Sequence, residues 1–300
     1  NRTFGIDFLI AIRDNIIGLF QCFYLYMKFR PRAVVVFGSY LSLLVAFWAK
    51  IFRVPIFVQE QNIRPGFANR IISCWSKKTF VPVVDTIEYF KNPKKIVAVG
   101  NPFRDDILNW QGRGEEAKKI LGLDPHRKTL LIVGGSRGSQ FINSIFWETL
   151  PLLKDFHFQV IHITGTESFQ EAKRNANLCP FPYLVYEFYP NPGILYAAAD
   201  FVISRSGANV TYELFWFNLP AILIPFRKAT EEHQIYNAQW LQKQQPVIIF
   251  EEEKLSGKNL EQAIRSLVGY PLKKNNKNED FRFAAKRIAG MIVEEISRRN

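Results

Sequence analysis

The chain has 300 residues, 48% of them hydrophobic, and is therefore long enough to bury the core of one or two domains. Its three cysteines, Cys22, Cys74 and Cys179, are widely separated, and its four histidines have no metal-ligand spacing. Neither a disulfide framework nor a zinc site is therefore expected, and the pattern indicates a reducing, cytoplasmic compartment.

The net charge of +12 is concentrated in the first part of the chain. Residues 1–110 contain 15 Lys and Arg against 7 Asp and Glu, whereas residues 111–300 contain 24 against 20. A basic N-terminal part indicates an anionic partner, either a nucleic acid or an anionic membrane surface.

Residues 4–32 are predicted to form a helix. Asp7, Arg13 and Asp14 interrupt it, which makes it a poor transmembrane span. Apolar residues spaced mostly by three and four form one stripe along it: Phe8, Ile12, Ile16, Phe20, Phe23 and Tyr24. The stripe either packs on the protein's own sheet or, rimmed by Lys28, Arg30 and Arg32, lies on a membrane.

Short β-branched runs then alternate with amphipathic stretches, which predicts parallel sheets covered on both faces. The first series of strands is predicted at residues 33–38, 54–60, 78–83 and 94–102. The pattern loosens between residues 107 and 128, the candidate junction between two doubly wound α/β domains. The second series is predicted at residues 129–135, 158–165, 183–188, 199–204, 220–226 and 246–250, and a terminal amphipathic helix at residues 280–299.

Glycines follow the first strand of the second series, in "TLLIVGGSRGSQFIN". This turn is either an ordinary strand-to-helix connection or a loop whose backbone approaches a phosphate at a helix N-terminus. It is neither a Walker A loop nor a GxGxxG motif, which argues against ATP hydrolysis and hydride transfer. A diphosphate still fits, with Ser136 among the contacts and Gly134, Gly135 and Gly138 in support.

The stretch "SRSGANVTYEL" is a second glycine-led helix start, at Gly207. Glu213 in its first turns is either a carboxylate favoured by the helix dipole or a ligand of a ribose diol. "EEHQ", which includes His233 and Gln234, offers partners for sugar hydroxyls.

These motifs together resemble the MurG family, the lipid-linked peptidoglycan N-acetylglucosaminyltransferases of glycosyltransferase family 28. The resemblance is carried, in chain order, by "FGSYLS", "EQN…PGFANR", "GNPFR", "GGSRGS…N", "VIHITG", "YAAADFVISRSGA…YEL", "PAILIPF" and "HQ…NA". It implies the GT-B fold, two Rossmann-like domains facing a cleft. It also implies transfer of GlcNAc from UDP-GlcNAc to undecaprenyl-diphosphate-MurNAc-pentapeptide (lipid I), which gives lipid II.

The resemblance implies three regions: an incomplete acceptor and membrane-associated domain at residues 1–115, a UDP-GlcNAc-binding domain at residues 126–275, and a C-terminal helix at residues 276–300 that packs back on the first domain. It also implies a peripheral location on the cytoplasmic face of the bacterial plasma membrane, with a role in cell wall synthesis, cell shape and cell division. No cofactor or divalent metal is implied, since no DxD-like pair lies beside the diphosphate loop.

The same resemblance assigns residues to the donor. Ser136 would hold the diphosphate, Tyr189 would face the uracil through its backbone, Glu213 would bind the ribose and Gln234, beside His233, would bind the GlcNAc hydroxyls. The other expected donor contacts are Asn62, Arg104, Ala208, Asn209, Val210, Thr211 and Tyr212.

Some positions depart from the family pattern. Ser39, Gln59, Arg137 and Ser139 stand where the family usually has Gly, His, Gln and Ala. The "GGTGGH"-type loop, which carries the histidine proposed as catalytic base, does not occur in residues 1–300. Because this loop is missing, about 60 residues, or two βα units, are expected ahead of Asn1. The start without methionine fits a fragment, and a true short variant is the alternative. The catalytic base is left unassigned.

Two further classes of function are weighed against the transferase. A non-catalytic UDP-sugar-binding remnant fits the same motifs and is favoured only by the missing loop. A nucleic-acid-binding protein is suggested by charge alone, and no reading motif supports it.

Overall fold

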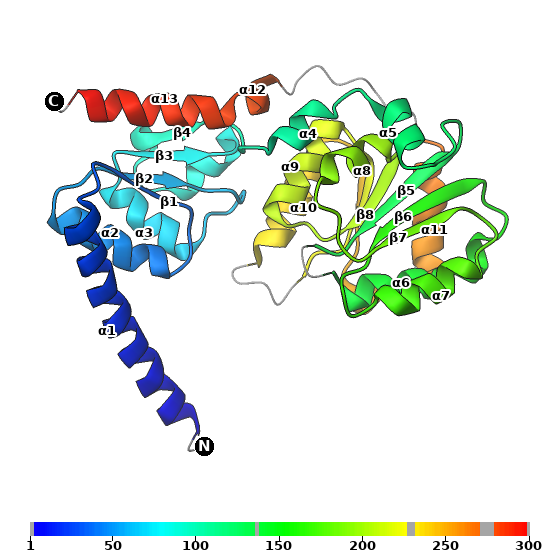
Figure 1. Ribbon diagram of the computed structural model, residues 1–300, viewed down its shortest axis with the longest axis horizontal. Coiled ribbons are helices and arrows are strands. Elements are labelled where there is room, and N and C mark those ends of the chain that lie inside the picture. The colour runs from blue at the N-terminus through cyan, green and yellow to red at the C-terminus, as the bar shows by residue number, and fades with distance from the viewer. Residues whose placement is uncertain (1–2, 136–137, 227–231, 271–278, 299–300) are drawn as a thin grey trace. The chain divides into compact units, whose positions relative to one another are not determined.

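The computed structural model describes residues 3–135, 138–226, 232–270 and 279–298, without the side chains of residues 3–9, 11, 12, 279 and 280 (Figure 1). The chain divides into two compact units: unit 1 comprises Asn1–Gly100 and Ala284–Asn300, and unit 2 comprises Asn101–Phe283. Each unit is built on a parallel sheet, so the predicted doubly wound α/β class is confirmed.

Unit 1 contains a four-stranded sheet in the order β1-β2-β3-β4, and all its pairs are parallel. The four predicted strands are therefore confirmed. Their bounds are β1 Val34–Val36, β2 Ile56–Gln59, β3 Lys78–Val81 and β4 Ile96–Ala98. The helices of this unit are α1 Thr3–Phe29, α2 Leu41–Ile51, α3 Phe67–Trp75 and α13 Ala284–Ser297, with short 3₁₀ helices η1 Val84–Tyr89 and η2 Pro93–Lys95.

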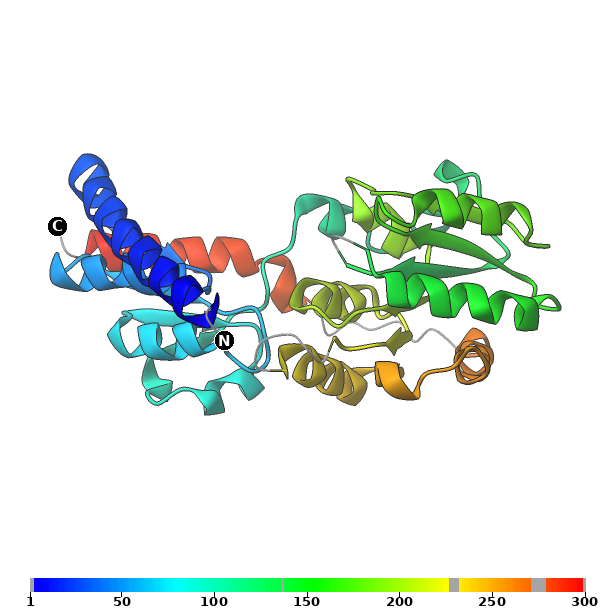
Figure 2. The same ribbon diagram turned by 90° about the horizontal axis from the view of Figure 1, so that it is seen from below.

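Both faces of the unit 1 sheet are buried. Successive side chains of a strand point to opposite faces, so each strand contributes to the packing on both. Ile56 and Val58 of β2 pack with α2 and α3 on one face. Phe57, between them, packs with Phe80 and with Ile288 of α13 on the other. Both views show α13 running along the sheet (Figures 1 and 2). The last helix thus completes the core of the unit that contains the first strands.

Two hydrogen bonds anchor helix α1 to α2, from the middle of α1 toward its C-terminal end. Trp48 Nε1 donates a hydrogen bond to the carbonyl of Leu19 at 2.8 Å, and the buried Tyr26 hydroxyl donates to the carbonyl of Val45 at 3.2 Å. No helix among the described residues is long and apolar enough to cross a membrane.

Unit 2 contains a six-stranded parallel sheet in the order β10-β9-β8-β5-β6-β7. The six predicted strands of the second series are confirmed. Their bounds are β5 Lys128–Val133, β6 Phe158–Ile163, β7 Tyr183–Tyr186, β8 Phe201–Ser204, β9 Ala221–Leu223 and β10 Val247–Ile249. The chain leaves β7 at one edge and returns at β8 beside β5, so the strand order reverses between β5 and β8.

Helices cover both faces of the unit 2 sheet (Figure 1). Leu130 and Ile132 of β5 pack against α6 and α11 in one core cluster, and α8 contacts β5 without contributing to that cluster. The helix bounds are α4 Asp105–Asn109, α5 Gly114–Ile120, α6 Gln140–Thr149, α7 Phe169–Asn177, α8 Pro192–Ala198, α9 Ala208–Phe217, α10 His233–Gln244, α11 Gly257–Val268 and α12 Glu279–Arg282, with 3₁₀ helices η3 Leu150–Leu153 and η5 Glu252–Lys254.

Two stretches differ in detail from their sequence patterns. Residues 107–128, the candidate junction, contain the end of α4 and all of α5, and Ile107 and Ala117 are fully buried in unit 2. The single helix predicted at residues 280–299 is two helices, α12 and α13, which divide at Phe283. The hydrophobic periodicity continues across this division, so the sequence predicts one helix. The two helices pack in different units: Phe281 packs in unit 2, whereas Ile288 packs in unit 1.

A buried polar triad fixes α6 to the sheet of unit 2. His162 Nε2, on β6, donates to Asn143 Oδ1 of α6 at 2.9 Å, and its Nδ1 accepts from the Tyr183 hydroxyl at 2.7 Å. Asn143 Nδ2 also donates to the carbonyl of Thr164 at 3.0 Å. Complete burial lowers the pKa of His162 to about 3, so its imidazole is neutral at physiological pH and is a structural group.

Candidate functional site

The candidate site lies in unit 2, at the carboxyl ends of β5 and β8, where the strand order reverses. In open parallel sheets this reversal leaves a crevice, because the loops after the two strands run to opposite faces. Both glycine-led helix starts singled out in the sequence follow these two strands: the loop after β5 leads into α6, and the loop after β8 leads into α9.

The loop after β5 leaves no room for a side chain at Gly134 or at Gly138. A Cβ on Gly134 would lie 2.3 Å from the backbone nitrogen of Ser139, and a Cβ on Gly138 would lie 2.2 Å from the carbonyl oxygen of Thr164. Gly135 and Gly138 also have φ of +96° and +76°, where glycine is strongly favoured. Ser136, the expected diphosphate ligand, and Arg137 lie outside the described residues.

Helix α6 begins directly after this loop and has a side-chain cap. Ser139 Oγ accepts a hydrogen bond from the backbone nitrogen of Ile142 at 3.3 Å. The cap satisfies one N–H group of the first turn, and the positive end of the helix dipole lies beside the loop. This arrangement suits an anion.

Helix α9 presents only part of its first turns to the surface. Asn209 is exposed, and Ala208 and Val210 are partly exposed. Thr211 is buried and its hydroxyl donates to the carbonyl of Gly207 at 2.9 Å, while the ring of Tyr212 is buried in the core. The run from Ala208 to Glu213 was expected to surround the nucleotide. Within it, Thr211 and Tyr212 have side chains directed to the protein interior.

Glu213 is the partly exposed acidic group of this site. The hydroxyl of the buried Tyr196, on α8, acts on its carboxylate. Burial raises the pKa of Glu213; the Tyr196 hydroxyl opposes that shift, the Asp106 carboxylate adds to it, and the Arg104 guanidinium opposes it. Burial therefore raises the free energy of the ionised carboxylate. Hydrogen-bond donors, such as the two hydroxyls of a ribose, would stabilise it.

Arg104 is held at the edge of the same region. Its Nε pairs with Asp106 at 2.9 Å, and its Nη2 donates to the carbonyl of Pro190 at 2.6 Å. Pro190 follows Tyr189, whose ring packs edge-on against Tyr186 with centroids 4.9 Å apart. The expected donor residues Arg104 and Tyr189 are thus brought together by the segment after β7.

Gln234 lies in the first turn of α10 and is fixed at both ends. Its Oε1 accepts from the backbone nitrogen of Phe226 at 2.9 Å, and its backbone carbonyl accepts from the Ser206 hydroxyl at 2.8 Å. Since Oε1 is engaged, Nε2 is the polar atom of this side chain that the Phe226 contact does not use. His233 begins α10 beside it.

Asn62 lies in unit 1, in the loop after β2. The buried Glu60 organises this loop: its Oε1 accepts from the backbone nitrogens of Gln61 and Asn62, both at 2.8 Å, and its Oε2 accepts from Asn69 Nδ2 at 2.8 Å. Asn62 Nδ2 also donates to Glu60 Oε1, at 3.2 Å.

Sequence reasoning missed three residues that shape these loops: Glu60, Tyr196 and Arg205. Glu60 stands inside the quoted "EQN" motif, and Arg205 inside "SRSG", but a charged residue in a loop carries no signal that it will be buried. Tyr196 is on α8 and Glu213 is on α9, with β8 between them, so no helical or strand periodicity links the two residues.

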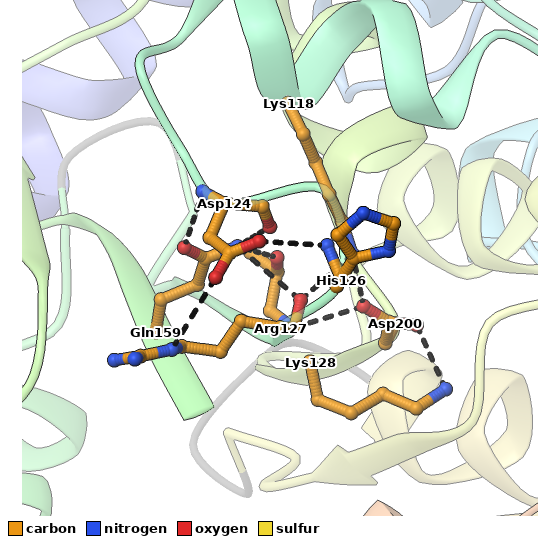
Figure 3. Close-up of polar contacts among 8 residues, drawn as sticks. Lys118, Asp124, His126, Arg127, Lys128, Gln159 and Asp200 are labelled. Carbon is orange, nitrogen blue, oxygen red and sulfur yellow. Dashed lines mark hydrogen bonds and ion pairs between the residues drawn. The ribbon is translucent and has the colours of Figure 1, made fainter. Parts of the chain in front are cut away.

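A second polar cluster of unit 2 lies at the amino ends of the strands (Figure 3). The Asp200 carboxylate accepts from Lys118 Nζ at 2.8 Å, Lys128 Nζ at 3.0 Å and the backbone nitrogen of Thr129 at 2.9 Å. Gln159 Nε2 donates to the carbonyl of Asp124 at 2.8 Å. The cluster ties the segment before β5 to the sheet, at the opposite edge from the candidate site.

Among the described residues, no group of three or more His, Cys, Asp and Glu side chains is arranged to hold a metal ion. The polar groups of the site are instead hydroxyl, amide, guanidinium and carboxylate groups. They are suited to hydrogen bonding a diphosphate and sugar hydroxyls.

Two family models match the chain. The glycosyltransferase family 28 N-terminal domain matches residues 1–81, and the glycosyltransferase family 28 C-terminal domain matches residues 129–292.

Curated relatives extend this match over most of the chain. A protein of Caldanaerobacter subterraneus subsp. tengcongensis, named UDP-N-acetylglucosamine--N-acetylmuramyl-(pentapeptide) pyrophosphoryl-undecaprenol N-acetylglucosamine transferase, is 32% identical over 282 residues, which are 93% of this chain and 77% of the relative. A protein of the same name from Halothermothrix orenii is 34% identical over 268 residues, covering 86% of this chain and 72% of the relative.

Solved structures share the fold. MurG of Acinetobacter baumannii superposes with a TM-score of 0.75 at 22% identity, covering 92% of this chain and 77% of that one. UDP-GlcNAc 2-epimerase of Neisseria meningitidis, bound to UDP-GlcNAc, superposes with a TM-score of 0.67 at 15% identity, covering 92% and 80%. The predicted GT-B architecture is confirmed.

Proposed function

The chain belongs to the MurG family of glycosyltransferase family 28, and from this premise we propose that it transfers GlcNAc from UDP-GlcNAc to lipid I, forming lipid II. In this reaction an acceptor hydroxyl attacks C1 of GlcNAc with inversion. The new C1–O bond forms as the bond to the diphosphate breaks, and UDP leaves. Relatives with this named activity support the proposal.

The observation that carries the proposal is the pair of helix starts at the strand reversal of unit 2. The glycines of the loop after β5 allow a close backbone approach, and α6 and α9 both begin at the carboxyl ends of the strands, where the N–H groups of a first helical turn can meet an anion. Negative charge develops on the departing diphosphate, and fixed dipoles at this position would stabilise it.

We assign the donor contacts on the same basis. The loop with Ser136 takes the diphosphate, Glu213 takes the ribose hydroxyls, and Gln234 takes the sugar through Nε2. Ala208 and Asn209 line the approach, whereas Thr211 and Tyr212 act through packing and backbone. Asn62 and Arg104 stay as proposed donor contacts, and we assign no catalytic base.

A peripheral membrane association is the second part of the proposal. The stripe residues of α1 with described side chains, Ile16, Phe20, Phe23 and Tyr24, are exposed, Phe20 by 65%. Phe29 and Phe47 add to this surface, and Lys28 and Lys50 lie on the same two helices. An apolar face with basic neighbours is typical of helices that lie in an anionic interface. A polyprenyl acceptor would be met there, on the cytoplasmic face.

The donor half is tested by calorimetric titration with UDP-GlcNAc, with UDP-galactose as the control. Selective binding of UDP-GlcNAc that is lost in Glu213→Ala is expected. Transfer is tested with radiolabelled UDP-GlcNAc and a lipid I analogue. Binding without turnover would contradict the transferase and leave a UDP-sugar-binding protein.

The membrane half is tested by co-sedimentation with vesicles of phosphatidylcholine, with and without phosphatidylglycerol. Phe20→Ser combined with Tyr24→Ser should reduce binding to the anionic vesicles. Leu178→Ser is the matched control, because Leu178 is an exposed apolar residue of unit 2. Equal binding of all three chains would contradict the assignment of α1.

A further inference from the structure

Arg205 is a charged residue of the candidate site to which neither the sequence analysis nor the proposed function assigns a role. It directly follows β8 and precedes the start of α9. Its side chain is only 11% exposed. A guanidinium is always charged, so burial at this level requires several partners.

The partners of Arg205 come from three other loops. Its Nη2 donates to Ser139 Oγ at 2.9 Å, its Nη1 donates to the carbonyl of Ile224 at 3.0 Å, and it forms an ion pair with Glu252. These residues follow β5, β9 and β10 respectively. In the sheet order β10-β9-β8-β5, one side chain therefore joins the carboxyl ends of four adjacent strands.

The bond to Ser139 crosses the strand reversal. Ser139 ends the glycine loop and caps α6, and its backbone nitrogen is the atom against which Gly134 is packed. Movement of Ser139 would therefore displace both the loop and the first N–H groups of α6. Arg205 restrains the point where the loop becomes the helix.

The sugar side of the site touches the same guanidinium. Its Cζ lies 5.4 Å from the ring centroid of Phe226, and the backbone nitrogen of Phe226 donates to Gln234 Oε1. A planar fork with five donors can serve several acceptors in one plane and stack on a ring, which a lysine ammonium cannot do.

We propose that Arg205 is a positioning residue. Its buried guanidinium holds the end of the glycine loop after β5, at Ser139, against the ends of β9 and β10. The loop is thereby ordered before it binds the diphosphate of a nucleotide sugar. The inference rests on the proposed donor site. Its physical basis is preorganisation, since a loop ordered before binding does not pay that entropy on binding.

The experiment compares Arg205→Met, Arg205→Lys and Ser139→Ala with the unaltered chain. UDP and UDP-GlcNAc are titrated by calorimetry, and uridine, which lacks the diphosphate, is measured by ligand-observed NMR. Arg205→Met should lower the affinity for UDP and UDP-GlcNAc about tenfold and leave uridine within about twofold. Arg205→Lys should not restore the loss.

A double-mutant cycle separates positioning from general destabilisation. If Arg205 acts through Ser139, the double variant Arg205→Met, Ser139→Ala should bind UDP no more weakly than Arg205→Met alone. Glu252→Gln keeps the arginine and removes its ion-pair partner, so it provides a milder second test if Arg205→Met folds poorly. Arg265→Met is the matched control, because Arg265 forms an ion pair with Glu261 on α11.

The outcomes are distinguishable. Full additivity of the two substitutions, an equal loss of uridine and UDP, or unaltered UDP affinity in Arg205→Met and Glu252→Gln would each overturn the inference alone. An unaltered chain that binds neither UDP nor UDP-GlcNAc would overturn the proposed donor site together with the inference.

Discussion

The hydroxyl of Tyr196, on α8, acts on the carboxylate of Glu213, on α9, and lowers the pKa of that carboxyl. Tyr196 is buried, whereas Glu213 is partly exposed. Desolvation raises the pKa of Glu213, and the Tyr196 hydroxyl opposes that shift.

Tyr196→Phe should therefore weaken the selection of the ribose. If Glu213 binds the diol, the unaltered chain should prefer UDP to 2′-deoxy-UDP, and this ratio should fall about tenfold in Tyr196→Phe. Competition titrations with the two nucleotides measure the ratio. Tyr189→Phe removes a hydroxyl nearby and serves as the control. An unchanged ratio in Tyr196→Phe would contradict a role of Tyr196 in ribose recognition.

The raised pKa of Glu213 predicts a pH dependence of stability. A carboxyl with a folded pKa above its unfolded value of 4.5 favours folding below pH 4.5, and this contribution is lost as the pH rises through the folded pKa. Glu213→Gln cannot titrate. Relative to the unaltered chain, it should therefore gain stability from pH 4 toward neutrality, as measured by urea unfolding. A constant difference over this range would contradict the raised pKa.

The same pKa predicts how nucleotide binding depends on pH. The ionised carboxylate accepts hydrogen bonds from the ribose hydroxyls, so UDP affinity should fall as the pH drops through the folded pKa of Glu213. Tyr196, Asp106 and Arg104 act on this group electrostatically. Because the Tyr196 hydroxyl lowers the pKa, Tyr196→Phe should move the fall to higher pH.

Gly207 provides a test that separates binding from folding. A Cβ at this position would meet no described atom within 4 Å, and the backbone there needs no glycine. Gly207→Ala should change the free energy of unfolding by less than about 0.5 kcal/mol. If the nucleotide approaches the start of α9, the same methyl group should weaken UDP-GlcNAc binding. Gly269→Ala, equally open among the described residues, is the control.

Substitution of Asp200 should lower the stability of the protein and leave UDP-GlcNAc binding unchanged. Its carboxylate accepts from two lysines and a backbone nitrogen, and Lys118 beside it is buried (Figure 3). Asp200→Asn leaves the buried ammonium without its countercharge and should cost about 3–5 kcal/mol of stability. The folded fraction should still bind UDP-GlcNAc as tightly, because the cluster lies at the amino ends of the strands. A selective loss of binding would contradict that placement.

Strand positions could be predicted because both sheets are parallel and covered on both faces. Strands such as β5 and β6 are then largely apolar runs, and loops with glycine follow them. The sequence pattern could also place Gly134 directly after a strand and Gly207 at a helix start. It could not show that Thr211 and Tyr212 in the same motif turn inward, because a helix of mixed composition can bury either face.

The sequence by itself determined the α/β class, the ten strands and the loops in which chemistry concentrates, since all of these follow from local periodicity and turn residues. Only the tertiary structure decided that β8 returns beside β5, and with it that Arg205 reaches Ser139 and that Tyr196 reaches Glu213. Such pairs join residues far apart in the chain, and burial chooses them through packing and hydrogen bonding that no local pattern encodes.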